Sequence, residues 1–133
     1  MQALCSLDVQ GDKAIDTALD FIRDTEDAPE VRREAERMLL GAWHGRAACD
    51  ELLERHSKHW DLKRMPVVDR AILRMAVWEM SSGHAHPAVA VAESVRIAQE
   101  FSTVDSPRFI NGVLMTIARE MPAAENLEKE EEE

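Results

Sequence analysis

The stretch that decides the fold is residues 67–80, which read VVDRAILRMAVWEM. On the helix that this stretch would form, apolar side chains occur on nearly every side, interrupted only by Asp69, Arg70, Arg74 and Glu79. A helix that is apolar almost all round is typical of the centre of a helical bundle. We therefore predict that residues 67–80 form the core helix of an all-α protein.

Prolines mark the starts of the neighbouring helices. Proline is tolerated at the first helical position because the N–H that it lacks would have no partner within the helix. Helical apolar spacing follows Pro29, Pro66, Pro87 and Pro107, whereas Pro122 falls where the last periodic segment stops. With the two segments before Pro29 and no strand signals, these starts predict about six or seven helices.

The helical segments carry several local predictions. Ser106 is the expected N-cap of the last helix, and His86 is expected at the N-terminus of the helix that follows it. Gly41 and Gly45 predict a bend or break in the long helical pattern after Pro29. The predicted core contains Ile72, Met75, Val95, Ile110, Val113, Leu114 and Ile117.

The chain is acidic, and its charge is unevenly distributed. Its 133 residues carry a net charge of −10, which argues against a protein that binds nucleic acid through a general basic field. Residues 1–54 hold 13 acidic and 6 basic side chains, residues 55–124 hold 7 and 9, and residues 125–133 hold 6 and 1. We predict a folded domain over residues 1–122 and a disordered acidic tail over residues 123–133.

The composition also bears on location and chemistry. Two cysteines are too few for a secreted disulfide framework, and the sequence has neither a signal peptide nor a run of about 20 apolar residues. These features predict a cytoplasmic protein without a membrane segment. Phosphate-binding glycine loops, nucleophile elbows and HExxH are missing, so we expect neither catalysis nor a cofactor.

Cys49, His56 and His59 are the best candidate for a metal site. Their spacing brings them to one face of a helix, where a thiolate and two imidazoles could share a zinc ion, as in a metal-dependent enzyme. The alternative is a small buried cysteine with two surface histidines. No fourth ligand is evident in the sequence, which favours the alternative.

Glu79 and the last helix offer candidate contact positions. Glu79 falls about 140° around its helix from Arg74, so its carboxylate needs either an internal hydrogen-bond donor or a partner's cation. Phe109 lies at the edge of an apolar stripe beside the solvent-facing Arg108, where it could cover the bundle or stack on an unpaired base. Gly112 falls on the exposed face of its helix, where a glycine is unfavourable. Either another chain approaches closely there, or Gly112 is a surface glycine without a specific role.

Five short blocks follow one another along almost the whole chain, from Met1 to Ala118. They are QAL at residues 2–4, VDRAILR at 68–74, WEM at 78–80, PAVAVAE at 87–93 and RFINGVL at 108–114. In order and spacing these blocks resemble the NusB family of transcription antitermination factors, and the block FINGVL is the most specific of them.

The resemblance implies an all-helical fold of two small helical-bundle subdomains and a role in ribosomal RNA transcription. It implies pairing with NusE, which is ribosomal protein S10, recognition of single-stranded boxA RNA, and action in the antitermination complex with RNA polymerase. On this pattern Glu79 matches an acidic position near the NusE and RNA surfaces. We predict that Glu79 and the exposed Gly112 bind the partner protein. The RNA-facing residues would be Gln2, Asp105, Ser106, Arg108 and Phe109.

A related domain precedes the catalytic domain of certain ribosomal RNA methyltransferases. The alternative is therefore a NusB-like protein-interaction or RNA-binding module without antitermination activity.

The sequence departs from the family pattern at its N-terminus. Family members usually carry an arginine-rich stretch directly before the Gln-Ala-Leu block, and an aromatic residue at the position of Cys5. Either the start codon lies further upstream or this is a variant with weaker RNA affinity, because arginines supply phosphate contacts and counterion release. We expect the chain to bind boxA-like RNA weakly alone and to need NusE for basic surface.

Overall fold

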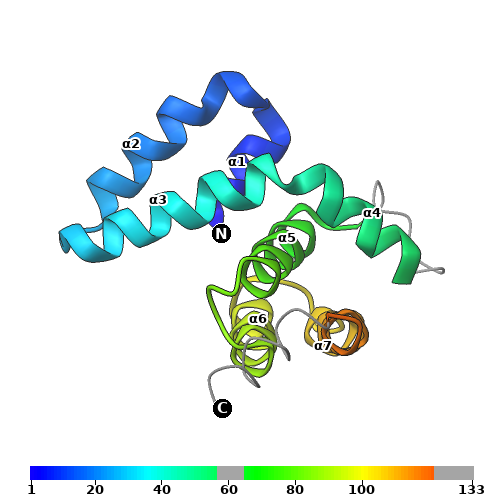
Figure 1. Ribbon diagram of the computed structural model, residues 1–133. Coiled ribbons are helices and arrows are strands. Elements are labelled where there is room, and N and C mark those ends of the chain that lie inside the picture. Colours follow the sequence, from blue (N-terminus) through cyan, green and yellow to red (C-terminus); the bar gives the residue numbers. More distant parts are fainter. Residues whose placement is uncertain (57–64, 122–133) are drawn as a thin grey trace, which may run out of the picture.

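The computed structural model of the chain describes residues 1–56 and 65–121, which form helices joined by short turns (Figure 1). No residue in these two ranges belongs to a strand, so the all-α prediction is confirmed. No helix there is long and apolar enough to span a membrane. The elements are α1 (Gln2–Gln10), the short 3-10 helix η1 (Asp12–Ala14), α2 (Ile15–Thr25), α3 (Pro29–His44), α4 (Arg46–His56), α5 (Val67–Ser81), α6 (Pro87–Phe101) and α7 (Ser106–Arg119).

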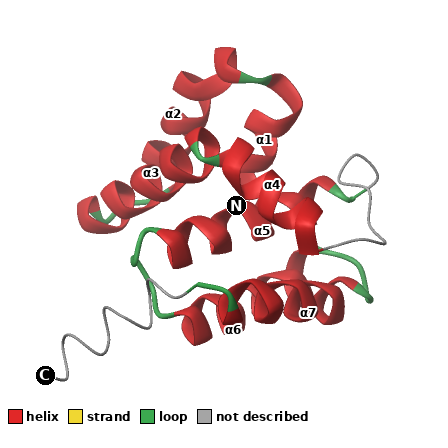
Figure 2. Cartoon of the chain, turned by 45° about the vertical axis from the view of Figure 1, so that its right-hand side comes forward, coloured by secondary structure: helices red, strands yellow, loops and turns green. Residues whose placement is uncertain are grey.

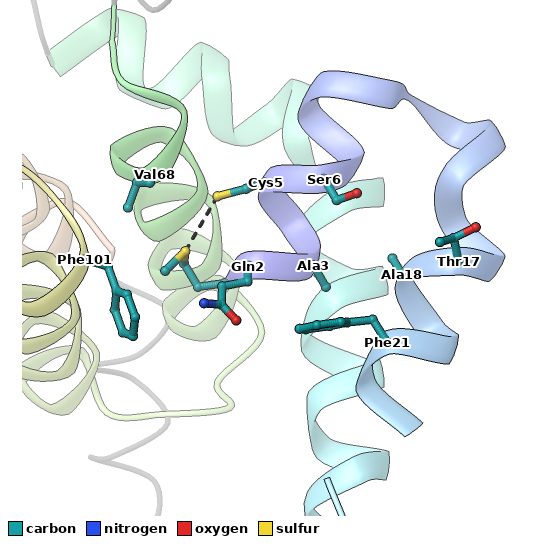
Figure 3. A pocket seen from close by; sticks show the side chains of 10 residues that line it. Gln2, Ala3, Cys5, Ser6, Thr17, Ala18, Phe21, Val68 and Phe101 are labelled. Carbon is teal, nitrogen blue, oxygen red and sulfur yellow. Dashed lines mark hydrogen bonds between the residues drawn. The ribbon is translucent and has the colours of Figure 1, made fainter. Parts of the chain in front are cut away.

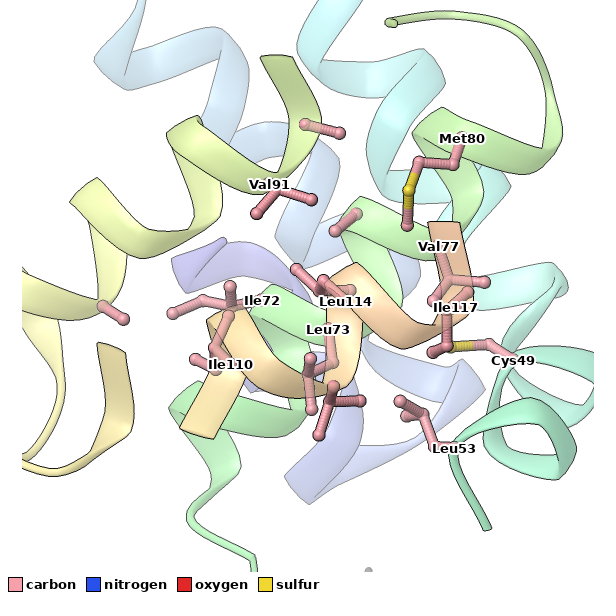
Figure 4. Close-up of a cluster of buried hydrophobic side chains, with 14 of the residues drawn as sticks. Cys49, Leu53, Ile72, Leu73, Val77, Met80, Val91, Ile110, Leu114 and Ile117 are labelled. Carbon is pink, nitrogen blue, oxygen red and sulfur yellow. The ribbon is translucent and has the colours of Figure 1, made fainter. Parts of the chain in front are cut away.

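The helices form two bundles that share α5. Figure 2 shows α1, α2 and α3 on one side of α5, with α6 and α7 on the other. The N-terminal core comprises the buried residues Ala3, Leu4, Leu7, Ala14, Ala18, Ile22, Leu39, Ala42, Trp43 and Ala71. The C-terminal core, shown in Figure 4, comprises Cys49, Leu53, Met65, Ile72, Leu73, Ala76, Val77, Met80, Ala90, Val91, Ala98, Ile110, Val113, Leu114 and Ile117.

The central helix contributes side chains to both cores. Ala71 is buried in the N-terminal core, and Trp78 packs at the edge of that core. Ile72 and Leu73 are buried in the C-terminal core. Because the two bundles cover different faces of α5, nearly every side of this helix needs to be apolar, and the prediction of a core helix over residues 67–80 is confirmed.

Two predicted core residues lie at core edges. Met75 is partly buried against the N-terminal core, and Val95 is partly buried against the C-terminal core. The buried stripe of α6 runs along Ala90, Val91, Ser94 and Ala98, which leaves Val95 at its border. The other five predicted positions are buried, namely Ile72, Ile110, Val113, Leu114 and Ile117.

The prolines located the helix starts closely. Pro29 and Pro87 are the first residues of α3 and α6, whereas Pro66 is the N-cap of α5 and Pro107 is the second residue of α7. His86 is the N-cap of α6, as predicted, and its Nδ1 accepts a hydrogen bond of 3.1 Å from the backbone N–H two residues later.

The prediction for the cap of α7 is wrong. Asp105 occupies the N-cap position without a side-chain hydrogen bond, and Ser106 is the first residue of the helix. The hydroxyl of Ser106 is instead directed to Asp69, a partner distant in sequence. At the other end, α7 stops at Arg119, and Pro122 lies outside the described residues.

The two glycines of the long N-terminal pattern have different roles. The predicted break falls at Gly45, which separates α3 from α4. Gly41 lies inside α3, where a Cβ atom would overlap the indole ring of Trp78. The absence of a side chain at Gly41 therefore allows α3 to approach α5 closely.

An ion-pair network joins α1 and α4 to the central helix. Arg74 Nη1 lies 2.9 Å from Asp8 Oδ1, and its Nη2 lies 2.7 Å from Asp50 Oδ2. Arg70 pairs with the same aspartate, with 2.5 Å between its Nη2 and Asp8 Oδ2. Burial lowers the pKa of Arg74, but the hydrogen bonds and charges of Asp50 and Asp8 outweigh burial and raise it.

Candidate functional site

The turn between α6 and α7 brings together four of the five residues predicted to face RNA. Asp105 and Arg108 are exposed, and Phe109 is partly buried against the edge of the C-terminal core. We call these three residues the α7 edge. Ser106 is only 2% exposed, so its side chain supports the turn and does not belong to its surface.

A buried carboxylate holds this turn from below. Ser106 Oγ donates a hydrogen bond of 2.8 Å to Asp69 Oδ2, and Ser102 donates to Asp69 Oδ1. Asp69 is 1% exposed and lies in the first turn of α5, where the positive end of the helix dipole favours a negative charge. One carboxylate thus connects the start of α5 to both ends of the α6–α7 turn.

Gln2 lies apart from the α7 edge, in an apolar groove of about 620 Å³. Figure 3 shows Gln2 between the rings of Phe21 from α2 and Phe101 from α6. Because Phe101 is the last residue of α6, the groove adjoins the turn that carries the α7 edge. Cys5 also lines the groove; its thiol donates to Met1 Sδ at 3.6 Å, and burial raises the pKa of that thiol.

Glu79 belongs to an acidic patch, which we define as Glu34 of α3, Glu79 of α5 and Glu93 of α6. Its side chain is half-buried. Burial raises the pKa of Glu79, His84 lowers it, and the carboxylates of Glu93 and Glu34 raise it further. Within residues 1–56 and 65–121 the Glu79 carboxylate forms no hydrogen bond and no ion pair, and His84 acts on it only through its charge, so the internal hydrogen bond that the sequence left open is not found there.

Two rings lie beside the acidic patch. The ring centroids of Trp78 and His84 are 5.1 Å apart, and His84 Nε2 contacts Glu34 Oε1. Trp78 also occupies the space over Gly41. The sequence showed Gly41 only as a bend signal, because nothing local connects a glycine in one helix to an indole in another.

Gly112 is exposed on α7. A Cβ atom built there would meet nothing within 4 Å. No contact within the described chain therefore requires a glycine at this position.

The described residues do not assemble the predicted metal site. Among them no group of three His, Cys, Asp or Glu side chains is arranged to hold a metal ion. Burial raises the pKa of the Cys49 thiol to about 12, and His56 Nε2 lies 2.9 Å from Glu120 Oε2. His59 lies outside the described residues. Cys49 is a small residue of the C-terminal core, as the alternative interpretation has it, but the His56 side chain is only 10% exposed, so His56 is not the surface histidine that this interpretation expected.

Comparison with solved structures first defines the class of protein. The chain is similar in structure to T. maritima NusB, with a TM-score of 0.78 and 28% sequence identity over 90% of this chain and 84% of that one. Its fold is therefore the helical fold of a NusB protein, with the α7 edge and the acidic patch on its surface.

Sequence comparisons give the family. The model of the NusB family matches residues 1–119. A transcription antitermination protein NusB of Symbiobacterium thermophilum is 41% identical over 93% of this chain and 87% of its own length. A protein of the same name from Saccharopolyspora erythraea is 40% identical over 89% of this chain and 80% of its own length. The chain belongs to the NusB family of transcription antitermination proteins.

Proposed function

We propose that this protein acts in antitermination by pairing with NusE, ribosomal protein S10, and that the pair binds boxA RNA in the complex with RNA polymerase. The observation that carries the proposal is the half-buried carboxylate of Glu79, which forms no hydrogen bond or ion pair within residues 1–56 and 65–121 and has only His84, itself in contact with Glu34, as a nearby positive group. A carboxylate withdrawn from water is costly unless it is paired. A basic residue of a protein partner would pair with it.

The surroundings of Glu79 support a basic partner. Glu34 and Glu93 place further carboxylates beside it from two other helices, although Glu34 contacts His84 and Glu93 pairs with Arg96. The whole chain carries a net charge of −10. Ribosomal proteins are typically basic, so the two proteins would attract each other over a distance as well as at the contact.

The α7 edge supports a limited contact with RNA. The guanidinium of Arg108 suits one phosphate, and Phe109 suits a stacked base. Asp105 on the same edge opposes a second phosphate. With so few contacts the chain alone would bind boxA RNA weakly, and NusE would supply the remaining basic surface.

On this proposal the protein is not an enzyme, needs no cofactor and works in the cytoplasm. The folded domain is residues 1–122, and the acidic segment 123–133 is not required for pairing with NusE. Removal of that segment should leave the affinity for NusE unchanged.

A titration of fluorescent boxA RNA with the chain, with NusE and with both tests the proposal. We expect weak binding by the chain alone and much tighter binding by the mixture. Glu79→Lys should weaken the pairing with NusE by about tenfold or more, whereas Glu100→Lys, a matched charge reversal on α6 outside the patch, should not. Equal RNA affinity of the chain and the mixture, or an unchanged pairing in Glu79→Lys, would contradict the proposal.

The contribution of Gly112 is tested in the same assay. If NusE approaches α7 closely at this position, Gly112→Ala should weaken the pairing while the isolated chain stays folded. An unchanged affinity would identify Gly112 as a surface glycine outside the contact.

A further inference from the structure

We propose that Asp69 is a positioning residue for RNA binding: its buried carboxylate holds the α6–α7 turn and thereby directs Arg108 and Phe109. The inference rests on the proposed role of the α7 edge in binding RNA. It concerns a residue that is itself inaccessible, because Asp69 is only 1% exposed.

Within residues 1–56 and 65–121, the hydrogen bonds to the Asp69 carboxylate come from Ser102 and Ser106 of the turn. No cation lies within ion-pair distance of its carboxylate in residues 1–56 and 65–121. Ser102 and Ser106 each lie within hydrogen-bond distance of a different carboxylate oxygen and can each donate one hydroxyl hydrogen. Ser102 Oγ also lies 2.9 Å from Ser106 Oγ, a second acceptor for its hydrogen. Since the Ser106 hydrogen is engaged, Thr103 Oγ1, 2.7 Å away, donates to Ser106 Oγ. Three hydroxyls of one turn are thus ordered by one buried carboxylate.

This anchor replaces the usual helix cap. The N-cap residue of α7, Asp105, makes no side-chain hydrogen bond to the helix. The backbone of the turn is closed by hydrogen bonds from the Ser102 N–H to the Ala98 carbonyl, from the Ser106 N–H to the Thr103 carbonyl at 3.1 Å, and from the Phe109 N–H to the Asp105 carbonyl. Among the described side chains, Ser106 therefore ties the start of α7 to α5 through its bond to Asp69, in addition to the apolar packing of α7.

The position of that start decides where the RNA contacts point. Arg108 and Phe109 follow Ser106 within the first turn of α7, so a rotation or shift of Ser106 moves both side chains together. A stacked base and a paired phosphate tolerate little displacement, because hydrogen bonds and ring contacts weaken steeply with distance and angle. Release of the turn should therefore lower RNA affinity without any loss of an RNA-contacting atom.

The test uses the complex of the full chain with NusE, with boxA RNA as the probe. Asp69→Ala removes both acceptors and should lower RNA affinity about tenfold. Asp69→Asn keeps one acceptor and should restore part of that loss, and Ser106→Ala should cost about threefold. Ser94→Ala is the matched control, because Ser94 is a buried serine of α6 whose hydroxyl bonds only within its own helix. Affinity for NusE should not change in any of these variants.

A double-mutant cycle separates positioning from general stability. In the background of Arg108→Ala with Phe109→Ala, the effect of Ser106→Ala or Asp69→Ala on RNA affinity should disappear, because the side chains through which they act are gone. Additive losses, or a parallel loss of NusE affinity, would show a purely structural role and overturn the inference. If Arg108→Ala with Phe109→Ala alone leaves RNA affinity unchanged, the proposed α7 edge is wrong and the inference falls with it. Should Asp69→Ala fail to fold, the cycle with Ser106→Ala decides.

Discussion

The two bundles on either side of α5 are held together by different means. Half of the ten buried residues of the N-terminal core are alanines, whereas the fifteen of the C-terminal core are mostly branched aliphatic residues. Small side chains bury little apolar area and so contribute less hydrophobic stabilisation. The N-terminal bundle compensates with polar links to α5 and α4, through Asp8, Arg74 and Asp50. A shared central helix can thus join two bundles of unlike chemistry.

Breaking the ion pairs of Arg74 should give the largest effect and test the difference between the two bundles most directly. Arg74→Ala would leave Asp50 and part of Asp8 without a cation in a largely buried setting, and we expect a loss of about 4 kcal/mol of unfolding free energy. Urea denaturation measures the loss. Hydrogen exchange should show that protection falls more in α1 than in α7. Arg96→Ala, which breaks only the exposed pairs of Arg96 with Glu93 and Glu100, should cost little; a similar loss in both variants would refute the special role of Arg74.

The C-terminal core should respond to loss of apolar volume. Leu114 is fully buried, and Leu114→Ala should cost about 3 kcal/mol through lost burial and the cavity left behind. Hydrogen exchange should rise first in α6 and α7, the reverse of the pattern for Arg74→Ala. Val104→Ala, at a position 97% exposed, is the control. Uniform loss of protection in both bundles would mean that the two cores unfold as one unit.

The close approach of α3 to α5 offers a smaller test on the N-terminal side. In Gly41→Ala the new methyl group would overlap the Trp78 indole, and we expect a loss of about 2 kcal/mol because the ring or α3 must shift. Tryptophan fluorescence and thermal unfolding measure the change. Gly112→Ala, where a Cβ meets open space, should instead be neutral or slightly stabilising. Unchanged stability and fluorescence in Gly41→Ala would show that α3 and α5 separate at little cost.

Glu79 is expected to give the smallest effect on stability. Folding raises the pKa of the Glu79 carboxyl above its ordinary value of 4.5, so ionisation of this group disfavours the folded state of the isolated chain. The stability that the protonated carboxyl contributes is therefore lost as the pH rises from 4.5 through the raised pKa of the folded state. Glu79→Gln should remove this pH dependence and slightly stabilise the chain at neutral pH while weakening its pairing with NusE. Denaturation at a series of pH values tests this; a less stable variant at neutral pH would show that the charge is well solvated.

Several features of the fold were predictable because they depend on local sequence. Pro29 and Pro87 mark helix starts through the fixed geometry of proline, and residues 67–80 were identified as central by their apolar surroundings. The cap of α7 was not predictable in the same way. Ser106 has the side chain of a good N-cap, but its hydroxyl donates to the buried carboxylate of Asp69 on α5 instead of capping the helix.

The candidate site likewise contains residues that the sequence identified and residues whose role only the structure shows. Glu79 stood out in the sequence because a carboxylate interrupts an apolar helix face, and the structure adds its two acidic neighbours on α3 and α6. Asp69 interrupts the same helix, yet its role depends on hydroxyls from a turn far along the chain. The five sequence blocks indicated the family, and the groove around Gln2 became visible only in the folded chain.

Residue order alone was enough to predict about six or seven helices, the central position of residues 67–80 and membership of the NusB family, because periodicity and motif spacing lie along the sequence itself. Folding in three dimensions decided which polar groups meet: Arg74 with Asp8 and Asp50, and Asp69 with the α6–α7 turn. The reason is physical. The apolar pattern determines which face of a helix is buried, but the rotation and crossing of helices around α5 determine which side chains come within hydrogen-bond distance.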